Sequence, residues 1–131
     1  MSADFLDSNV VLYLASDIEP KIAVVRKLLD AEPVISAQVL NEVTNVLRRK
    51  LRFEWAEIDR FIRRAVLLTT VLPISEETNR SARSLAARYG FAWYDAVIVA
   101  SALEADCTRL CTEDMHDGQK IGDLTIVNPF R

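Results

Sequence analysis

The segment from Trp93 to Ala105 constrains the fold most, because it has helical spacing and is apolar on almost every side. Its hydrophobic residues 96–100, Ala102 and Leu103 together cover nearly the whole circumference of an ideal helix. A helix of this kind is not stable with one face in water. We therefore expect it to be buried against a β-sheet.

Short apolar segments with strand character alternate with amphipathic helices along the whole chain. Ser36 and Ser75 are predicted to cap the N-termini of two helices, and Gly90 is a natural helix stop. This alternation is typical of an α/β domain with a mainly parallel central sheet flanked by helices on both faces. The predicted strands are 3–6, 33–35, 69–74, 109–112 and 124–127, and the predicted helices begin near Pro20, Ser36, Glu54, Ser75 and Trp93.

The chain has 131 residues, 50 % of them hydrophobic, which suits one globular core and predicts a single domain over residues 1–131. No apolar run reaches the roughly 18 residues of a membrane span, and the first residues do not resemble a signal peptide. Cys107 and Cys111 lack the spacing of a disulfide framework and the second pair that a zinc site would need. We therefore expect a cytoplasmic protein with reduced cysteines.

Four acidic residues occupy positions that stability alone does not favour. Asp7 and Asp114 each follow a predicted strand, and open parallel sheets bind ligands beyond the carboxyl ends of their strands. Glu42 lies at the edge of the apolar stripe of its helix. Asp95 begins the most apolar helix of the chain, where we expect it to be half-buried.

Each acid also has a purely structural explanation. Asp7 could cap the turn that follows it, and Asp95 suits the positive end of a helix dipole. Glu42 could pair with Arg49 or Asn45. Asp114 lies in a polar run and could belong to an ordinary turn.

The four acids together favour a metal site. Converging carboxylates repel each other by on the order of a few kcal/mol per pair at an effective dielectric constant of about 20. A hard divalent cation removes this cost, and Mg²⁺ or Mn²⁺ prefers oxygen ligands and retains bound water. Such a site suits the attack of a metal-bound water on a phosphodiester.

Four segments of the sequence, in this order, resemble the PIN-domain ribonucleases, and the last two especially resemble VapC-type toxins of type II toxin-antitoxin systems. They are FLDSNVVLY, NEV, YDAVIVASALEADC and LCTEDMHDGQ. The resemblance covers the whole chain and implies a PIN-like fold. It also implies a catalytic site formed by Asp7, Glu42, Asp95 and Asp114. Asp7 and Asp95 would ligate the metal directly, and the other two would complete the site directly or through water.

The same resemblance implies further site residues. Asp117 corresponds to a fifth carboxylate at the metal, whereas the neighbouring Glu113 is left out. Asn9 and Thr112 match positions whose polar side chains orient the metal-binding carboxylates.

The family likeness implies an endoribonuclease that uses Mg²⁺ or Mn²⁺ to hydrolyse RNA phosphodiester bonds. It also implies a homodimer and inhibition by a cognate antitoxin, a peptide of which enters the acidic groove. The net charge is −3, yet residues 48–64 contain seven bases against three acids. This run is either a solvated face, an antitoxin-binding surface or an RNA-binding face whose candidate phosphate contacts are Arg48, Arg49, Arg63 and Arg64.

Other functions fit the residues less well. A haloacid-dehalogenase-like phosphatase would have a second acid two residues after Asp7, where this chain has Asn9. A phospho-accepting receiver module would have an acidic pair after the first strand and a lysine at a late strand end. A catalytically silent PIN-fold interaction module stays open, although the retained acids argue against it. We expect the aromatic residues Trp55, Trp93 and Tyr94 to lie in the core or at an interface.

Overall fold

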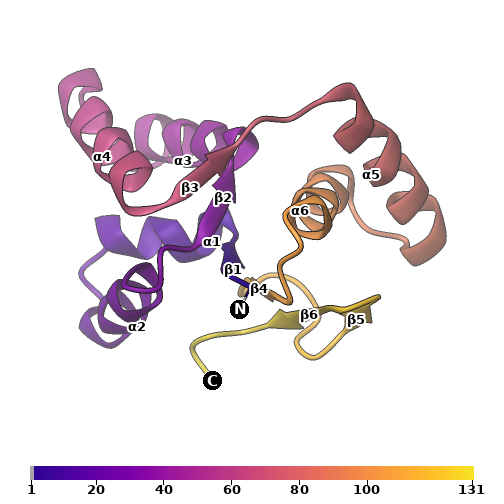
Figure 1. Cartoon of the computed structure of the whole chain (residues 1–131). Coiled ribbons are helices and arrows are strands. Elements are labelled where there is room, and N and C mark those ends of the chain that lie inside the picture. The colour runs from indigo at the N-terminus through magenta and orange to yellow at the C-terminus, as the bar shows by residue number, and fades with distance from the viewer. Residues whose placement is uncertain (1) are drawn as a thin grey trace.

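The computed structural model describes residues 2–131, and in this range six strands form one sheet (Figure 1). The strand order is β3-β2-β1-β4-β6-β5, and every neighbouring pair is parallel except β5 and β6. The predicted fold class, a mainly parallel sheet flanked by helices, is confirmed. The strands are β1 Asp4–Leu6, β2 Val34–Ser36, β3 Thr70–Leu72, β4 Arg109–Cys111, β5 Lys120–Ile121 and β6 Leu124–Val127.

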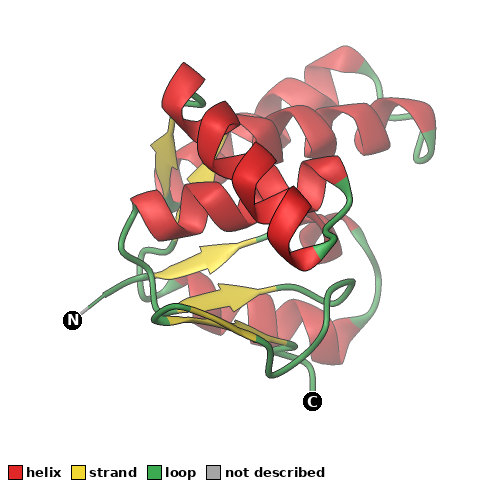
Figure 2. Cartoon of the chain, turned by 90° about the vertical axis from the view of Figure 1, so that its right-hand side faces the viewer, coloured by secondary structure: helices red, strands yellow, loops and turns green. Residues whose placement is uncertain are grey.

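Helices cover both faces of this sheet. The helices α1 to α4 lie on one side and α5 and α6 on the other, and the view turned by 90° again shows helices on both sides of the strands (Figures 1 and 2). The α-helices are α1 Ser8–Val11, α2 Glu19–Leu29, α3 Ala37–Arg49, α4 Trp55–Leu68, α5 Glu76–Tyr89 and α6 Trp93–Glu104, and a 3₁₀-helix, η1, spans Leu12–Ala15.

The helix ends follow the predicted capping chemistry. The side chain of Ser36 accepts a hydrogen bond from the Val39 amide at the start of α3. Ser75 caps α5 in the same way and forms a capping box with Thr78. Gly90 ends α5 in the left-handed conformation, with a φ of 75°. These caps fix where each helix begins or ends relative to the sheet.

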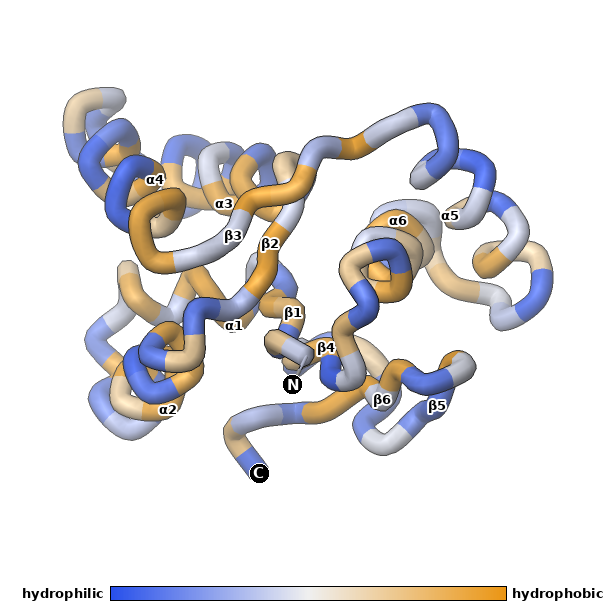
Figure 3. Tube along the Cα trace, viewed as in Figure 1, coloured by the Kyte–Doolittle hydropathy of each residue, from blue (hydrophilic) through white to orange (hydrophobic). Residues whose placement is uncertain are grey.

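The core lies on both sides of the central strands, and α6 belongs to it as predicted. Residues 96–102 of α6 are all buried. Hydrophobic residues concentrate along the strands and α6, whereas α5 is largely hydrophilic (Figure 3). Cys107 and Cys111 are buried and free within the part of the chain that the structure describes.

Three features differ from the sequence prediction. The strand β5 was not predicted, because it has only two residues and forms a tight hairpin with β6 through Gly122 and Asp123. Residues 8–11 form a short helix directly after β1. The aromatic side chains placed in the core or at an interface are not core residues, because Trp55 is 59 % and Tyr94 63 % exposed.

No helix within residues 2–131 has both the length and the apolar character that a bilayer crossing requires.

Candidate active site

Asp7 lies at the carboxyl end of β1, where the main chain leaves the sheet. Its amide donates a hydrogen bond to the Cys111 carbonyl at 3.0 Å, which continues the pairing of β1 with β4. One carboxylate oxygen caps α1 by accepting from the Ser8 amide at 2.7 Å, and the other accepts from the Thr112 hydroxyl at 2.9 Å. The carboxylate is 5 % exposed, and burial raises the pKa of Asp7 despite these hydrogen bonds. Asp7 therefore caps a helix and also faces the carboxyl edge of the sheet.

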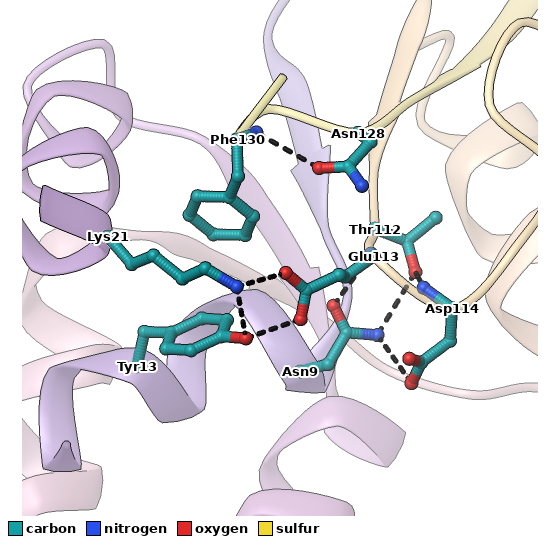
Figure 4. A network of polar contacts seen from close by, with 8 residues as sticks. All are labelled: Asn9, Tyr13, Lys21, Thr112, Glu113, Asp114, Asn128 and Phe130. Atoms are coloured by element: carbon teal, nitrogen blue, oxygen red, sulfur yellow. Dashed lines mark hydrogen bonds and ion pairs between the residues drawn. The ribbon is translucent and has the colours of Figure 1, made fainter. Parts of the chain in front are cut away.

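Asn9 connects the end of β1 to the loop after β4 (Figure 4). Its side-chain nitrogen is 3.3 Å from Asp7 Oδ2, 3.0 Å from Thr112 Oγ1 and 3.1 Å from Asp114 Oδ2, and donates toward all three. Its side-chain oxygen accepts from the Glu113 amide at 3.0 Å. One side chain thus fixes two of the predicted carboxylates relative to each other.

Thr112 is fully buried between the same two acids. Its hydroxyl donates to Asp7 and accepts from the Asp114 amide at 3.3 Å. The orienting contacts expected for Asn9 and Thr112 are therefore present in the structure.

Glu42 reaches the same region from α3 and is only partly buried. Its Oε1 atom is buried and has no hydrogen-bond partner within residues 2–131, and no hydrogen bond or ion pair there joins it to Arg49 or Asn45. Burial and then the negative charge of Asp7 raise the pKa of Glu42 to about 7. An unpartnered oxygen beside another carboxylate is a site that a cation would stabilise.

Asp95 completes the group from the first turn of α6, and it is partly buried as expected. Burial and then the charge of Asp114 raise the pKa of Asp95. The charges of Asp95 and Asp114 also contribute to the raised pKa of Asp7. Four carboxylates from β1, α3, α6 and the loop after β4 thus share one electrostatic environment.

The donor set fits a hard divalent cation in chemistry, because every candidate ligand is a carboxylate oxygen. As the side chains stand, no three of the histidine, cysteine and acidic residues between positions 2 and 131 are close enough to hold an ion. Rotation of the carboxylates toward a common centre would be needed on binding. Burial and, after it, the mutual repulsion of the acids raise the pKa values of Asp7 and Glu42, and a cation would relieve both effects. The unpartnered Glu42 oxygen also favours such a rearrangement around a cation.

The two remaining acids of the loop point elsewhere. Glu113 accepts hydrogen bonds from Tyr13 and from Lys21, the latter at 2.5 Å, and the contact with Lys21 lowers the pKa of Glu113 (Figure 4). Asp117 accepts from the Asn128 amide at 2.7 Å and is 3.6 Å from the Arg131 guanidinium. The structure therefore does not bring Asp117 together with the other four acids.

A groove of about 850 Å³ opens beside the acids and includes the site residue Glu42 and also Ser8, which follows Asp7 in the chain. Sequence reasoning missed this groove and also missed the cluster of Lys21, Tyr13 and Glu113. The spacing of Gln38 and Glu42, one turn apart on α3, was an available signal for the groove. The groove is lined by Ser8, Ala37, Gln38, Asn41, Glu42, Asn45, Val46, Pro73, Ile74 and Tyr94.

The four arginines considered for RNA binding do not line this groove. Arg63 is paired with Asp59 at 2.9 Å. Arg48 donates to a main-chain carbonyl and lies 5.2 Å from the ring centroid of Trp55. Arg64 lines a separate cavity between α2 and α4, and Arg49 is exposed on α3.

Comparison with protein families gives a match over most of the chain. The profile described as PIN domain matches residues 5–116, which include all four acids of the site. The chain belongs to the PIN domain family. The phosphatase and receiver alternatives are thereby excluded. A search among curated proteins found no significant match.

Solved structures support the fold of this PIN domain. A toxin-antitoxin complex from Klebsiella pneumoniae matches with a TM-score of 0.72 and 24 % identity over 98 % of both chains. The VapC20 toxin of Mycobacterium tuberculosis, described as cleaving the sarcin-ricin loop, matches with a TM-score of 0.66 and 17 % identity over 86 % of this chain and 90 % of its own. VapBC2 from Rickettsia felis, bound to a fragment of its promoter DNA, matches with a TM-score of 0.70 and 16 % identity over 95 % of this chain and 96 % of its own.

Proposed function

We propose that this PIN domain is a metal-dependent endoribonuclease that acts as the toxin of a toxin-antitoxin pair. The observation that carries the proposal is the network at the carboxyl edge of the sheet, in which hydrogen bonds from Asn9 join Asp7 to Asp114. A buried and unpartnered oxygen of Glu42 adds to it, and the raised pKa values of Asp7, Glu42 and Asp95 support it. One structural neighbour is described as a toxin-antitoxin complex and another as a toxin that cleaves the sarcin-ricin loop, and both support the same biological role.

In the proposed mechanism, Asp7 and Asp95 hold the cation directly, and Glu42 and Asp114 complete its shell directly or through water. When bound, Mg²⁺ or Mn²⁺ would supply a water nucleophile and would offset the negative charge of the phosphodiester. Asn9 and Thr112 hold the Asp7 carboxylate in place through the hydrogen bonds described above. Asp117 is held by the Asn128 amide and by Arg131, so we leave it outside the proposed ligand set.

Cleavage assays with single carboxylate variants test this proposal. We expect wild-type protein with Mn²⁺ to cut structured RNAs such as transfer RNA and ribosomal RNA fragments. Asp7→Asn and Asp95→Asn should reduce the initial rate by on the order of 100-fold or more, because each removes a direct metal ligand. Glu113→Gln is the matched control, since Glu113 faces Lys21, and should retain most of the activity. Cleavage that persists in both aspartate variants would refute the site.

A protein partner is supported by the second cavity, about 690 Å³ in volume, which lies between α2 and α4. Its lining includes hydrophobic residues such as Leu29 and Phe61. The three bases Arg26, Arg60 and Arg64 also line it, against the two acids Asp30 and Glu57, which leaves a net positive charge. We propose that an apolar, acid-flanked segment of the antitoxin binds here, which favours antitoxin binding over RNA binding for Arg64. The double variant Arg60→Glu/Arg64→Glu should then weaken binding of the cognate antitoxin and leave RNA cleavage unchanged.

The proposal includes a cytoplasmic homodimer. Leu67 on α4 is 84 % exposed and Val66 beside it 44 %, so this helix offers an apolar surface that a second copy would cover. Light scattering that gives the mass of one chain across the micromolar range would contradict the dimer and leave the nuclease proposal standing.

A further inference from the structure

The groove beside the acids differs in charge from a phosphate-binding surface. Its lining contains no lysine or arginine, and its single charged residue is Glu42. A phosphate chain is repelled by such a surface unless a cation lies between them. The neutral parts of an RNA, its bases, meet no such repulsion.

The groove also offers the groups that bind bases. Tyr94, directly before Asp95, is 63 % exposed on one side, and Ile74 is 38 % exposed in the link from β3 to α5. An exposed aromatic ring provides a stacking surface for a base of any kind. The Tyr94 side chain therefore lines the same groove as Glu42 and is largely left open by the described residues.

Three amide side chains of α3 line the same groove. Gln38, Asn41 and Asn45 follow one another at helical spacing along α3, on the same groove as Glu42. The Gln38 amide donates to the Tyr94 carbonyl at 3.2 Å, so α3 is tied to the start of α6. Asn41 and Asn45 are exposed. Each amide carries both a donor and an acceptor, which suits the edge of an unpaired base.

We propose that this groove binds unpaired nucleobases next to the cleaved phosphate, with Tyr94 as the stacking surface and Asn41 and Asn45 as contacts to base edges. This inference rests on the proposed nuclease function, because Ser8 and Glu42 join the groove to the acidic site. A base in a duplex is already stacked and paired and cannot enter the groove.

The test measures RNA binding separately from cleavage. A fluorescein-labelled unstructured 15-nucleotide RNA is titrated with Asp7→Asn protein in Mg²⁺, alongside the same strand in a duplex and the same strand with abasic central positions. Tyr94→Leu should weaken binding of the intact single strand by about tenfold, the size expected for loss of one stacked base. Tyr94→Phe should bind within about twofold of the parent, because the ring is retained. Trp55→Leu is the control for an exposed aromatic outside the groove.

The inference is supported if the parent protein binds the abasic strand more weakly than the intact strand. Tyr94→Leu should then bind the abasic strand as well as the parent does. Equal affinities of parent and Tyr94→Leu for the intact strand would overturn it, and metal-dependent cleavage by the wild type would show that the nuclease proposal survives. A Tyr94→Leu variant that loses self-association but keeps its RNA affinity would assign the groove to a second copy and overturn the inference. Absence of both cleavage and RNA binding in the wild type would refute the nuclease proposal and the inference with it.

Discussion

Asp7 combines two tasks that usually fall to different residues. One oxygen caps α1 through the Ser8 amide, and the other is held by the Thr112 hydroxyl. The carboxylate is thereby fixed at the carboxyl end of β1 in a buried environment that disfavours its charge. The structural interpretation of this residue as a helix cap is confirmed, whereas its role as a metal ligand stays a prediction.

Thr112→Val tests how much the hydroxyl contributes. The change keeps the shape of the side chain but removes the donor to Asp7 Oδ2, in a fully buried position. We expect a loss of about 1–3 kcal/mol in unfolding free energy, measured by urea denaturation. The affinity for Mn²⁺ should fall by about 10- to 100-fold, measured by calorimetry. Unchanged metal affinity with reduced stability would show that Thr112 supports only the fold.

The raised pKa of Glu42 predicts that the unfolding free energy of the metal-free protein falls as the pH rises. Its pKa is raised from 4.5 to about 7 in the folded protein, so the folded state binds the proton more tightly than the unfolded state. Without metal, this contribution is therefore fully present below about pH 4.5 and is lost as the pH rises through about 7. The raised pKa values of Asp7 and Asp95 act in the same direction.

Glu42→Gln should consequently stabilise the metal-free protein at pH 8 and have little effect at pH 4.5. We expect a gain on the order of 1 kcal/mol at pH 8, because water still reaches part of this side chain. Chemical denaturation at the two pH values measures it, with the exposed Glu19→Gln as the control. A loss of stability at pH 8 would contradict the assigned environment.

At the scale of the elements, sequence patterns predicted what depends on local chemistry. The apolar circumference of α6 and the serine caps of α3 and α5 were readable because each is decided within a few residues. The two-residue strand β5 was not, since its pairing with β6 is too short to give a periodic pattern. The exposure of Tyr94 could not be predicted from local sequence, because it depends on which elements cover the start of α6.

Gly90→Ala tests the end of α5. Gly90 has a φ of 75°, and a Cβ added there would meet no atom within 4 Å, so the cost is one of backbone conformation alone. We expect a loss of about 1–2 kcal/mol in unfolding free energy. Gly90→Asn should cost less, because asparagine tolerates the left-handed region better. Equal stability of the alanine variant and the wild type would place the end of α5 elsewhere.

At the scale of the whole molecule, the fold gathers acids that lie far apart in the chain. The adjacent positions of β1 and β4 in the sheet bring Asp7 beside Asp114, and Glu42 and Asp95 reach them from α3 and α6. The order of the acidic segments predicted these four residues, whereas the sequence alone could not show that Asp117 bonds to Asn128. For the adjacent acids Glu113 and Asp114, the resemblance included only Asp114, and the structure adds that Glu113 pairs with Lys21 whereas Asp114 accepts from Asn9.

The central claim is that these four carboxylates form one divalent cation site, and thermal unfolding with and without Mn²⁺ tests it most directly. Binding to the folded form alone at 100 times the dissociation constant adds about 2.7 kcal/mol, which corresponds to a rise of several degrees in Tm. We predict this rise for the wild type and for Glu113→Gln, and a much smaller one for Asp7→Asn and Asp95→Asn. A wild-type Tm that does not respond to millimolar Mn²⁺, or an equal rise in the Asp95→Asn variant, would contradict the account.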